Sequence, residues 1–321
     1  MKKISLICIV ALTASFFPQR IIAESMGEIY YVSPEGDDAN DGSIDMPFRT
    51  ISYAAGVMQA GDTCYIRGGV YRETVSVKNK GTKEKPIAFK PYNDESVTIS
   101  GADVLNGSWQ KYKGSIYYTK MDWSLDNANM IFADGVMQQE ARWPNITDGL
   151  DSSQYAKPDA FSNGVITDAD IPNVDMSNSL IWFRTNSGYW SFTGRVISNS
   201  AGKMNITYDA AYPPDNTSIY YAARNLNLLD SAGEWYLDEE ADRLYFWAPG
   251  DVNPEKLEIS AQKRKNAVEF SDARYVTLDG IEIMGANIEM SDNTENCTLN
   301  NISAKYLSYD VALPKNGSGS C

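Results

Sequence analysis

The chain has 321 residues, a formal net charge of −14 and no histidine. Such acidity disfavours binding to nucleic acid and to anionic membrane surfaces, so we expect neither partner. The lack of histidine excludes Ser-His-Asp and Cys-His catalysis and histidine-bearing zinc motifs. Acid–base chemistry must then use Asp, Glu, Lys, Arg or Tyr, a restriction that glycosidases with paired carboxylates can meet.

We interpret residues 1–23 as a secretory signal peptide. Lys2 and Lys3 precede an apolar run from Ile4 to Phe17, and cleavage is expected after Ala23. The apolar run is too short to span a bilayer, and no later segment is long enough. We therefore expect an exported protein, secreted or held in the periplasm or at the cell surface, without membrane insertion.

Residues 24–105 are predicted to form an N-terminal cap and the first coils of a solenoid. The stretch GDDANDGSIDMPFRTIS suggests Asx-type turns and then Thr50 as the N-cap of a short helix, Ile51 to Met58. Its aspartates depart from the calcium-loop pattern because no bidentate Glu follows where it is required. We therefore expect no metal and no cofactor, with calcium as the alternative.

Short strands with alternating apolar residues follow the cap. Alternation directs every second side chain into a shared interior. We interpret Cys64, like Cys297 later in the chain, as a small buried apolar residue rather than a reactive thiol. The predicted inward pairs are Cys64 and Ile66, Val75 and Val77, Ile87 and Phe89, and Val97 and Ile99.

The pattern changes between residues 106 and 255. The turn Ala133-Asp134-Gly135 between two apolar segments predicts a hairpin. Further strands are predicted at SLIWFRT, GRVISN, MNITYDA and RLYFWAP, and a helix at ARNLNLLDS. We expect an inserted antiparallel domain that resembles a β-sandwich.

Residues 256–321 contain an internal repeat. VEFSD at Val268 returns as IEMSD at Ile288, and VTLDGI at Val276 returns as CTLNNI at Cys297. A period of about twenty residues with strand-type alternation indicates a solenoid whose coils bury their apolar faces by stacking. The predicted fold is all-β, a right-handed parallel β-helix interrupted by the inserted domain.

Two long motifs carry a family resemblance. The segment YYVSPEGDDANDGSIDMPFRTISYAAGVMQAGDTCYIRGGVYRE resembles the start of secreted β-helix proteins with the pectin-lyase fold that act on polysaccharides. The pair FADGVMQQEARWPN and LNLLDSAGEWYLDEEADRLYFWAP resembles the insertion domain of glycoside hydrolase family 141. The resemblance implies an exported glycan-degrading protein whose catalytic carboxylates lie on coils past the insertion.

No position in this chain matches those catalytic carboxylates, so the resemblance assigns none. The chain ends soon after the repeat, with a short polar tail. We expect a truncated product or a fragment of a longer protein, with a partner chain that supplies further coils as the alternative.

The candidate sugar-binding residues of the inserted domain are Arg142, Trp143, Tyr189 and Trp190. A tryptophan ring can stack on a pyranose, and arginine can donate to hydroxyl groups. The alternative is that Trp143 fills an interface while Arg142 pairs with Glu140 or another carboxylate. Tyr189 and Trp190 follow a turn sequence and are predicted to be exposed.

The last coil supplies Lys305, Tyr309 and Asp310. Tyr309 is a further sugar-binding candidate, Lys305 a base for a lyase and Asp310 an acid for a hydrolase, with solvated turn residues as the alternative. The leading prediction is a monomeric glycoside hydrolase-like protein that acts on polysaccharide or oligosaccharide. Since the later coils are expected to be missing, an inactive chain is part of this prediction. A β-helix polysaccharide lyase and a non-catalytic glycan-binding protein are the alternatives.

Overall fold

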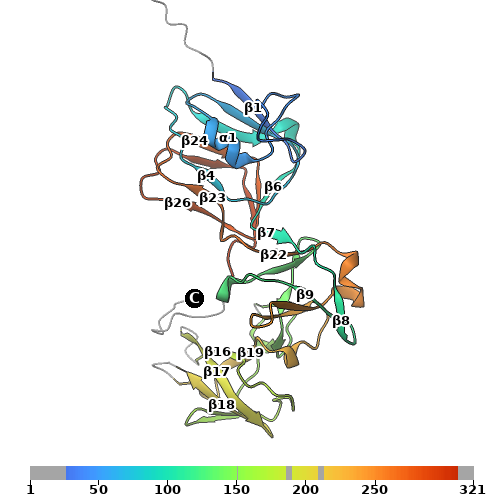
Figure 1. The fold of residues 1–321 in the computed structure, drawn as a ribbon. Helices are drawn as coiled ribbons and strands as arrows, with labels where there is room; N and C mark the ends of the chain where they lie inside the picture. The colour runs from blue at the N-terminus through green and yellow to red at the C-terminus, as the bar shows by residue number, and fades with distance from the viewer. Residues whose placement is uncertain (1–26, 150, 186–189, 209–212, 310–321) are drawn as a thin grey trace, which may run out of the picture.

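The computed structural model describes residues 27–149, 151–185, 190–208 and 213–309. The predicted signal peptide lies outside these residues. The described chain is nearly all β and has two lobes, one with α1 and β24 and one with β8, β9 and β16 to β18 (Figure 1). Within the described residues, no helix has the length and apolar character needed to cross a membrane.

The first lobe consists of three sheets built from parallel strand pairs. Successive passes of the chain visit the three sheets in turn, and each pass adds its strands beside those of the pass before. The first sheet contains β1 (Ile29–Val32), β2 (Thr63–Ile66), β5 (Ile87–Pro91), β24 (Val276–Asp279) and β27 (Thr298–Asn300). The second contains β3 (Gly69–Tyr71), β6 (Val97–Ser100), β25 (Glu282–Met284) and β28 (Ser303–Lys305), and the third contains β4 (Val75–Val77), β23 (Asn266–Phe270) and β26 (Asn287–Met290).

The interior of this lobe confirms the predicted alternation, since all eight predicted inward residues between Cys64 and Ile99 are buried. Phe89 is aligned with Cys64 on one side and with Leu278 on the other. The repeat also pairs as predicted, because Leu278 lies opposite Leu299 and Val268 opposite Ile288. Period-2 side-chain alternation and stacking therefore account for this core.

The predicted capping helix is present as α1 (Ile51–Val57), with Met58 as its C-cap. The Thr50 hydroxyl accepts a hydrogen bond from the Tyr53 amide at 3.1 Å, as an N-cap does. Glu73 accepts from the amides of Ile51 and Ser52, and the Asn79 amide donates to two carbonyls at the other end of the helix. Both ends of α1 are thus tied to the coils.

The aspartates before α1 act as turn and cap acceptors. Asp37 and Asp41 each accept from the amide two residues later, which confirms the predicted Asx turns. Asp38 accepts from the Thr50 amide and hydroxyl, both at 2.9 Å. The described residues contain no group of three or more His, Cys, Asp and Glu side chains that could hold a metal ion.

The second lobe contains three further sheets. One comprises β11 (Val136–Met137), β10 (Ile131–Ala133), β22 (Ile259–Gln262) and β7 (Ala102–Val104). The next comprises β12 (Gln139–Glu140), β20 (Glu234–Asp238), β21 (Arg243–Trp247), β9 (Ile116–Lys120) and β8 (Gln110–Lys113). The third comprises β13 (Arg142–Trp143), β19 (Ile219–Ala223), β16 (Leu180–Arg184), β17 (Ser191–Ser200), β18 (Lys203–Tyr208), β15 (Val165–Thr167) and β14 (Ala160–Ser162).

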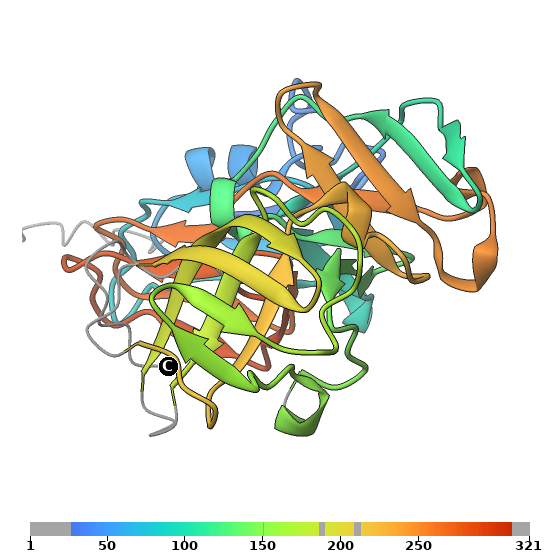
Figure 2. The ribbon, with the colours of Figure 1, turned by 90° about the horizontal axis from the view of Figure 1, so that it is seen from below.

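These sheets pack in layers, with the β20–β21 sheet in the middle. Trp235 and Phe246 of that sheet join a core with Ile131 and Ile259 of the β10–β22 sheet. On its other face, Tyr245 packs in the core of the seven-stranded sheet, which Figure 2 shows in yellow and green on the near side of the molecule. Since β7 and β22 pair, the chain leaves and rejoins the first lobe through adjacent strands between the lobes (Figure 1).

Two predictions for the inserted region need correction. It is not purely antiparallel, because β12 pairs with β20 in parallel and makes that sheet mixed. The predicted helix at ARNLNLLDS is only the 3₁₀ turn η4 (Leu226–Leu228), which Asn225 caps. The other 3₁₀ turns of the described chain are η1 (Tyr92–Asp94), η2 (Asp126–Ala128), η3 (Ser152–Gln154), η5 (Pro249–Asp251) and η6 (Pro254–Lys256).

The predicted hairpin is confirmed, with β10 and β11 joined through Asp134 and Gly135. Both turn residues have positive φ, 47° and 75°, as a two-residue turn of this hand requires. The predicted strands at SLIWFRT, GRVISN, MNITYDA and RLYFWAP correspond to β16, β17, β18 and β21.

Candidate functional site

The segment from Gln139 to Trp143 crosses from one sheet of the second lobe to the next. β12 pairs with β20, and β13 pairs with β19. Between them, the Ala141 amide donates to the Trp235 carbonyl at 2.7 Å, and the Ala141 carbonyl accepts from the Arg224 amide at 3.1 Å. Ala141 faces the core, so alternation places Glu140 and Arg142 on the other side of the segment.

Glu140 and Arg142 line a pocket of about 520 Å³, which we call the junction pocket. Its walls come from the inserted strands, from the loop after β13 and from the segment after β28. Tyr309 from that last segment lines it together with Arg142, so two predicted sugar-binding residues meet here. The described lining is Met137, Gln138, Gln139, Glu140, Arg142, Ile146, Thr147, Gly149, Tyr155, Trp182, Tyr221, Trp235, Tyr306 and Tyr309.

Arg142 is 7% exposed, and its guanidinium group lies over aromatic rings. Its guanidinium carbon is 3.8 Å from the centre of the Tyr221 ring and 5.1 Å from that of Tyr155. Nε donates to the Pro144 carbonyl at 3.0 Å, whereas Nη2 is buried and has no hydrogen-bond partner among the described residues. Burial lowers the pKa of Arg142, because desolvation penalises its charge.

The aromatic wall of the pocket follows from strand pairing. Trp182 on β16 is aligned with Tyr221 on β19, and the two rings stack at 5.3 Å with an interplanar angle of 24°. Tyr155, after β13, lies 5.8 Å from the Trp182 ring. Burial raises the pKa of Tyr221 to about 12 and also raises that of Tyr309. Both phenols are therefore neutral near pH 7 and can donate hydrogen bonds.

Glu140 has its own cationic partner. The Arg224 Nε lies 3.1 and 3.2 Å from the two Glu140 carboxylate oxygens, and Arg224 also donates to the Asn127 side chain at 2.6 Å. Burial raises the pKa of Glu140, while Arg224 opposes that rise. The alternative in which Arg142 pairs with Glu140 is therefore not the arrangement observed.

The other candidate residues lie elsewhere. Trp143, one residue after Arg142, faces the opposite side, where its ring is 5.9 Å from that of Tyr220. Trp190 also packs against this core, so the structure favours a packing role for both tryptophans. Lys305 is exposed and its Nζ lies 3.2 Å from a Glu282 carboxylate oxygen. Tyr189 and Asp310 lie outside the described residues.

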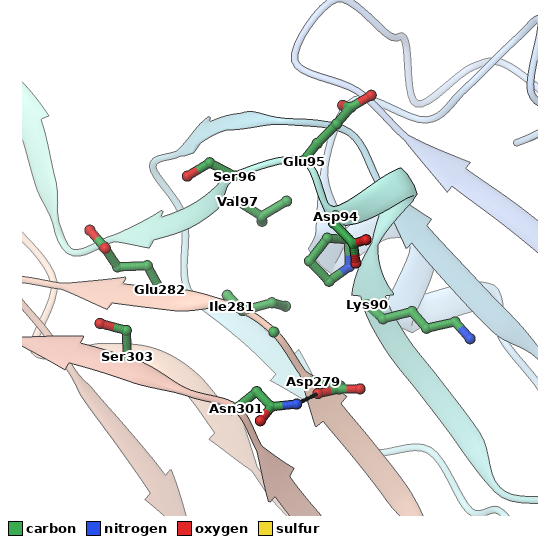
Figure 3. Close-up of a pocket in the computed structure, with 12 residues that line it drawn as sticks. Lys90, Asp94, Glu95, Ser96, Val97, Asp279, Ile281, Glu282, Asn301 and Ser303 are labelled. Carbon is green, nitrogen blue, oxygen red and sulfur yellow. Dashed lines mark hydrogen bonds between the residues drawn. The ribbon is translucent and has the colours of Figure 1, made fainter.

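A second pocket, of about 490 Å³, lies at the turns that connect the first two parallel sheets (Figure 3). Three of its four carboxylates, Glu95, Asp279 and Glu282, make contacts between coils. Asp279 accepts from the Asn300 and Asn301 amides at 2.9 and 3.0 Å, and Glu282 pairs with Lys305. Glu95 extends away from the pocket in Figure 3 and accepts from Arg67. The junction pocket is therefore the stronger candidate site.

Sequence reasoning missed most of the aromatic wall. Tyr155, Tyr221 and Tyr306 were not among the candidate residues. The run IYYAA contains a usable signal, because alternation sends Tyr220 and Tyr221 to opposite faces of β19. Which face borders a pocket depends on pairing between distant strands, which the sequence does not state.

No protein-family model matches the chain. A protein of Bacillus subtilis (strain 168), the uncharacterized protein YwoF, is 38% identical over 151 residues, which are 47% of this chain and 32% of YwoF. Pectate lyase PEL9 of Emericella nidulans is 34% identical over 118 residues, 36% of this chain and 25% of the lyase. The chain thus matches about a third and a quarter of the length of these relatives.

A solved glycoside hydrolase has a similar structure. The superposition covers 80% of this chain and 50% of the hydrolase, with a TM-score of 0.63 and 17% sequence identity. At this level of identity the likeness concerns the fold, and it places the described chain among β-rich proteins built like that hydrolase.

Proposed function

We propose that the protein is carbohydrate-active and that the junction pocket binds part of an oligosaccharide. The observation that carries this proposal is the grouping of a buried arginine with Tyr155, Trp182, Tyr221 and Tyr309 in one pocket. Aromatic faces pack against the apolar faces of sugar rings, and neutral phenols and a guanidinium donate to hydroxyl oxygens. A volume near 520 Å³ lies within the usual range for small-ligand sites.

Glycoside hydrolysis is the reaction that we propose first. Hydrolysis needs a carboxylic acid that protonates the leaving oxygen and a second carboxylate. Glu140 is the carboxyl among the described lining residues of the junction pocket, and its ion pair with Arg224 suits the second, charged carboxylate. The solved glycoside hydrolase of similar fold is compatible with this reaction.

A polysaccharide lyase is the second candidate, and the similarity to pectate lyase PEL9 favours it. Such an enzyme removes a proton beside a uronate carboxylate. The cationic side chains that we propose for this chemistry are Arg142 and Lys305.

We further propose that the three parallel sheets form a right-handed β-helix of the family 141 type. In this proposal residues 1–23 direct export, residues 106–255 form an inserted domain, and the protein works as a monomer without a metal or cofactor. The ordered passes through three parallel sheets support the β-helix. Light scattering would test the monomer.

The test is to incubate the protein with a panel of plant and host glycans and to follow two signals. A hydrolase releases reducing ends without ultraviolet absorbance, whereas a lyase also creates an absorbing unsaturated product. Binding without either signal would identify a non-catalytic glycan-binding protein. Trp182→Ala should weaken binding, while Tyr112→Ala, at an aromatic residue that is 49% exposed and outside the pocket lining, should not. No binding to any glycan would contradict the proposal.

A further inference from the structure

The junction pocket has an uncompensated positive charge in a strongly acidic protein. Arg142 and Glu140 are the charged residues in its described lining. The Glu140 charge is matched by Arg224, which contacts both carboxylate oxygens. Arg142 contacts uncharged groups: the Tyr221 ring, the Tyr155 side chain and the Pro144 carbonyl. Within the described lining, its charge therefore has no anionic counterpart.

The geometry of Arg142 is suited to a planar anion. The guanidinium carbon lies 3.8 Å from the centre of the Tyr221 ring, and Nε donates to the Pro144 carbonyl, so two contacts hold the group in place. Nη2 is a buried donor without a partner in the described part of the chain. A buried, unsatisfied donor on a cation is costly, and a ligand carboxylate would supply both the acceptor and the opposite charge.

The other polar groups around Arg142 are neutral hydrogen-bond donors, and they do not compete with a ligand carboxylate for the arginine. Tyr309 and Tyr221 carry neutral hydroxyls, and Gln138 and Gln139 provide amide groups at the same pocket. A neutral sugar would leave the arginine charge unpaired after displacing water from the pocket. An acidic sugar would not, so electrostatics distinguishes the two ligands.

We propose that the junction pocket is specific for an acidic sugar, a residue that carries a carboxylate, and that Arg142 binds this carboxylate. The inference rests on the proposed function, since it names the substrate class of the same pocket. The net charge of −14 repels a polyanion at long range, so the inference concerns one seated uronate residue and not affinity for charge in general.

The test is calorimetric binding of matched acidic and neutral probes to the full chain. The acidic probes are tri-galacturonate and a xylo-oligosaccharide substituted with glucuronate, and each neutral probe is the same compound after reduction of its carboxyl groups. One acidic probe should bind roughly 10- to 100-fold more tightly than its neutral counterpart, the range expected for a charge-assisted hydrogen bond. Added salt should reduce this preference.

Variants of Arg142 test whether this residue causes the preference for the acidic probe. Arg142→Gln should abolish it, so that each acidic probe binds no more tightly than its neutral counterpart. Arg142→Lys keeps the charge but not the planar donor group, so it should retain part of the preference. The matched control is Arg49→Gln, at an exposed arginine outside the pocket lining. Melting curves verify that each variant folds. If a variant does not fold, the comparison of acidic and neutral probes on the wild-type protein still tests the inference.

The outcomes separate the two proposals. Equal binding of both members of each pair, or binding of neutral glycans alone, would overturn the inference and leave the carbohydrate-binding function standing. A preference that persists in Arg142→Gln would also overturn it. If neither these probes nor any glycan of the panel binds, the proposed function itself fails.

Discussion

Glu234 should make the stability of the second lobe depend on pH. Its side chain is 2% exposed on β20, beside Gln139 of the crossing segment. Oε2 accepts from the amides of Asp230 and Ser231, both at 3.1 Å, whereas Oε1 is buried without a partner among the described residues. Burial raises the pKa of Glu234 from 4.5 to about 7, since the backbone amides of Asp230, Ser231 and Arg142 only partly offset the desolvation of the carboxylate.

The direction and the size of the pH effect of Glu234 on the unfolding free energy follow from proton linkage. The folded protein holds the Glu234 proton more tightly than the unfolded chain, so this contribution to stability is complete below about pH 4.5. It is lost as the pH rises through about 7. Each pH unit between the two pKa values corresponds to about 1.4 kcal/mol, which gives a loss of roughly 3 kcal/mol in unfolding free energy by pH 8.

The assay is urea denaturation of wild type and of Glu234→Gln at pH 5 and pH 8, followed by tryptophan fluorescence. The seven tryptophans lie between Trp109 and Trp247, so this signal reports on the second lobe alone. Wild type should lose stability between the two pH values by up to roughly 3 kcal/mol more than the variant does. Glu84→Gln, at an exposed glutamate, should retain the wild-type pH dependence. An unchanged pH dependence in Glu234→Gln would refute the reasoning.

Three further predictions concern the first lobe. Phe89→Ala removes a ring that is 1% exposed in the stacked core and should lower the unfolding free energy by about 3–5 kcal/mol, measured by urea denaturation with circular dichroism. Asn79→Ala leaves the Ala55 and Met58 carbonyls without their side-chain donor, so the same measurement should show a loss of about 1–3 kcal/mol. Burial raises the pKa of the Cys64 thiol, so a thiol reagent should label Cys64 only after unfolding and the half-buried Cys297 earlier, as peptide mass mapping would show. Prompt labelling of Cys64 in native protein would contradict the buried assignment.

The coil interior was predictable because its information is local. Period-2 alternation within a strand predicts which side chains point inward, and turn residues predict where each strand ends. The burial of Cys64, Phe89 and Leu278 follows from that pattern alone. The Thr50 cap was equally local, since its acceptor and donor are three residues apart.

The second lobe was less predictable because its decisive pairings are distant. Glu140 pairs with Arg224, which lies 84 residues away in the sequence, and not with the nearby Arg142 as the sequence suggested. The parallel pair β12–β20 has the same origin. At ARNLNLLDS, the leucines resemble a helical stripe, but Leu228 and Leu229 instead fill the core after a single capped turn.

The two lobes meet in a way that explains where the candidate site formed. Pairing of β7 with β22 fixes the departure and the return of the chain beside one another, so the second lobe is held against the last described coils. Met284 and Tyr309 from the end of the described chain pack against the cluster of Ala102, Met130 and Phe132. The crossing from β12 to β13 then presents Glu140 and Arg142 to the same junction. Because side chains of both lobes form the walls, a sugar bound there would contact both at once, and its binding should stabilise the segment after β28 together with the second lobe.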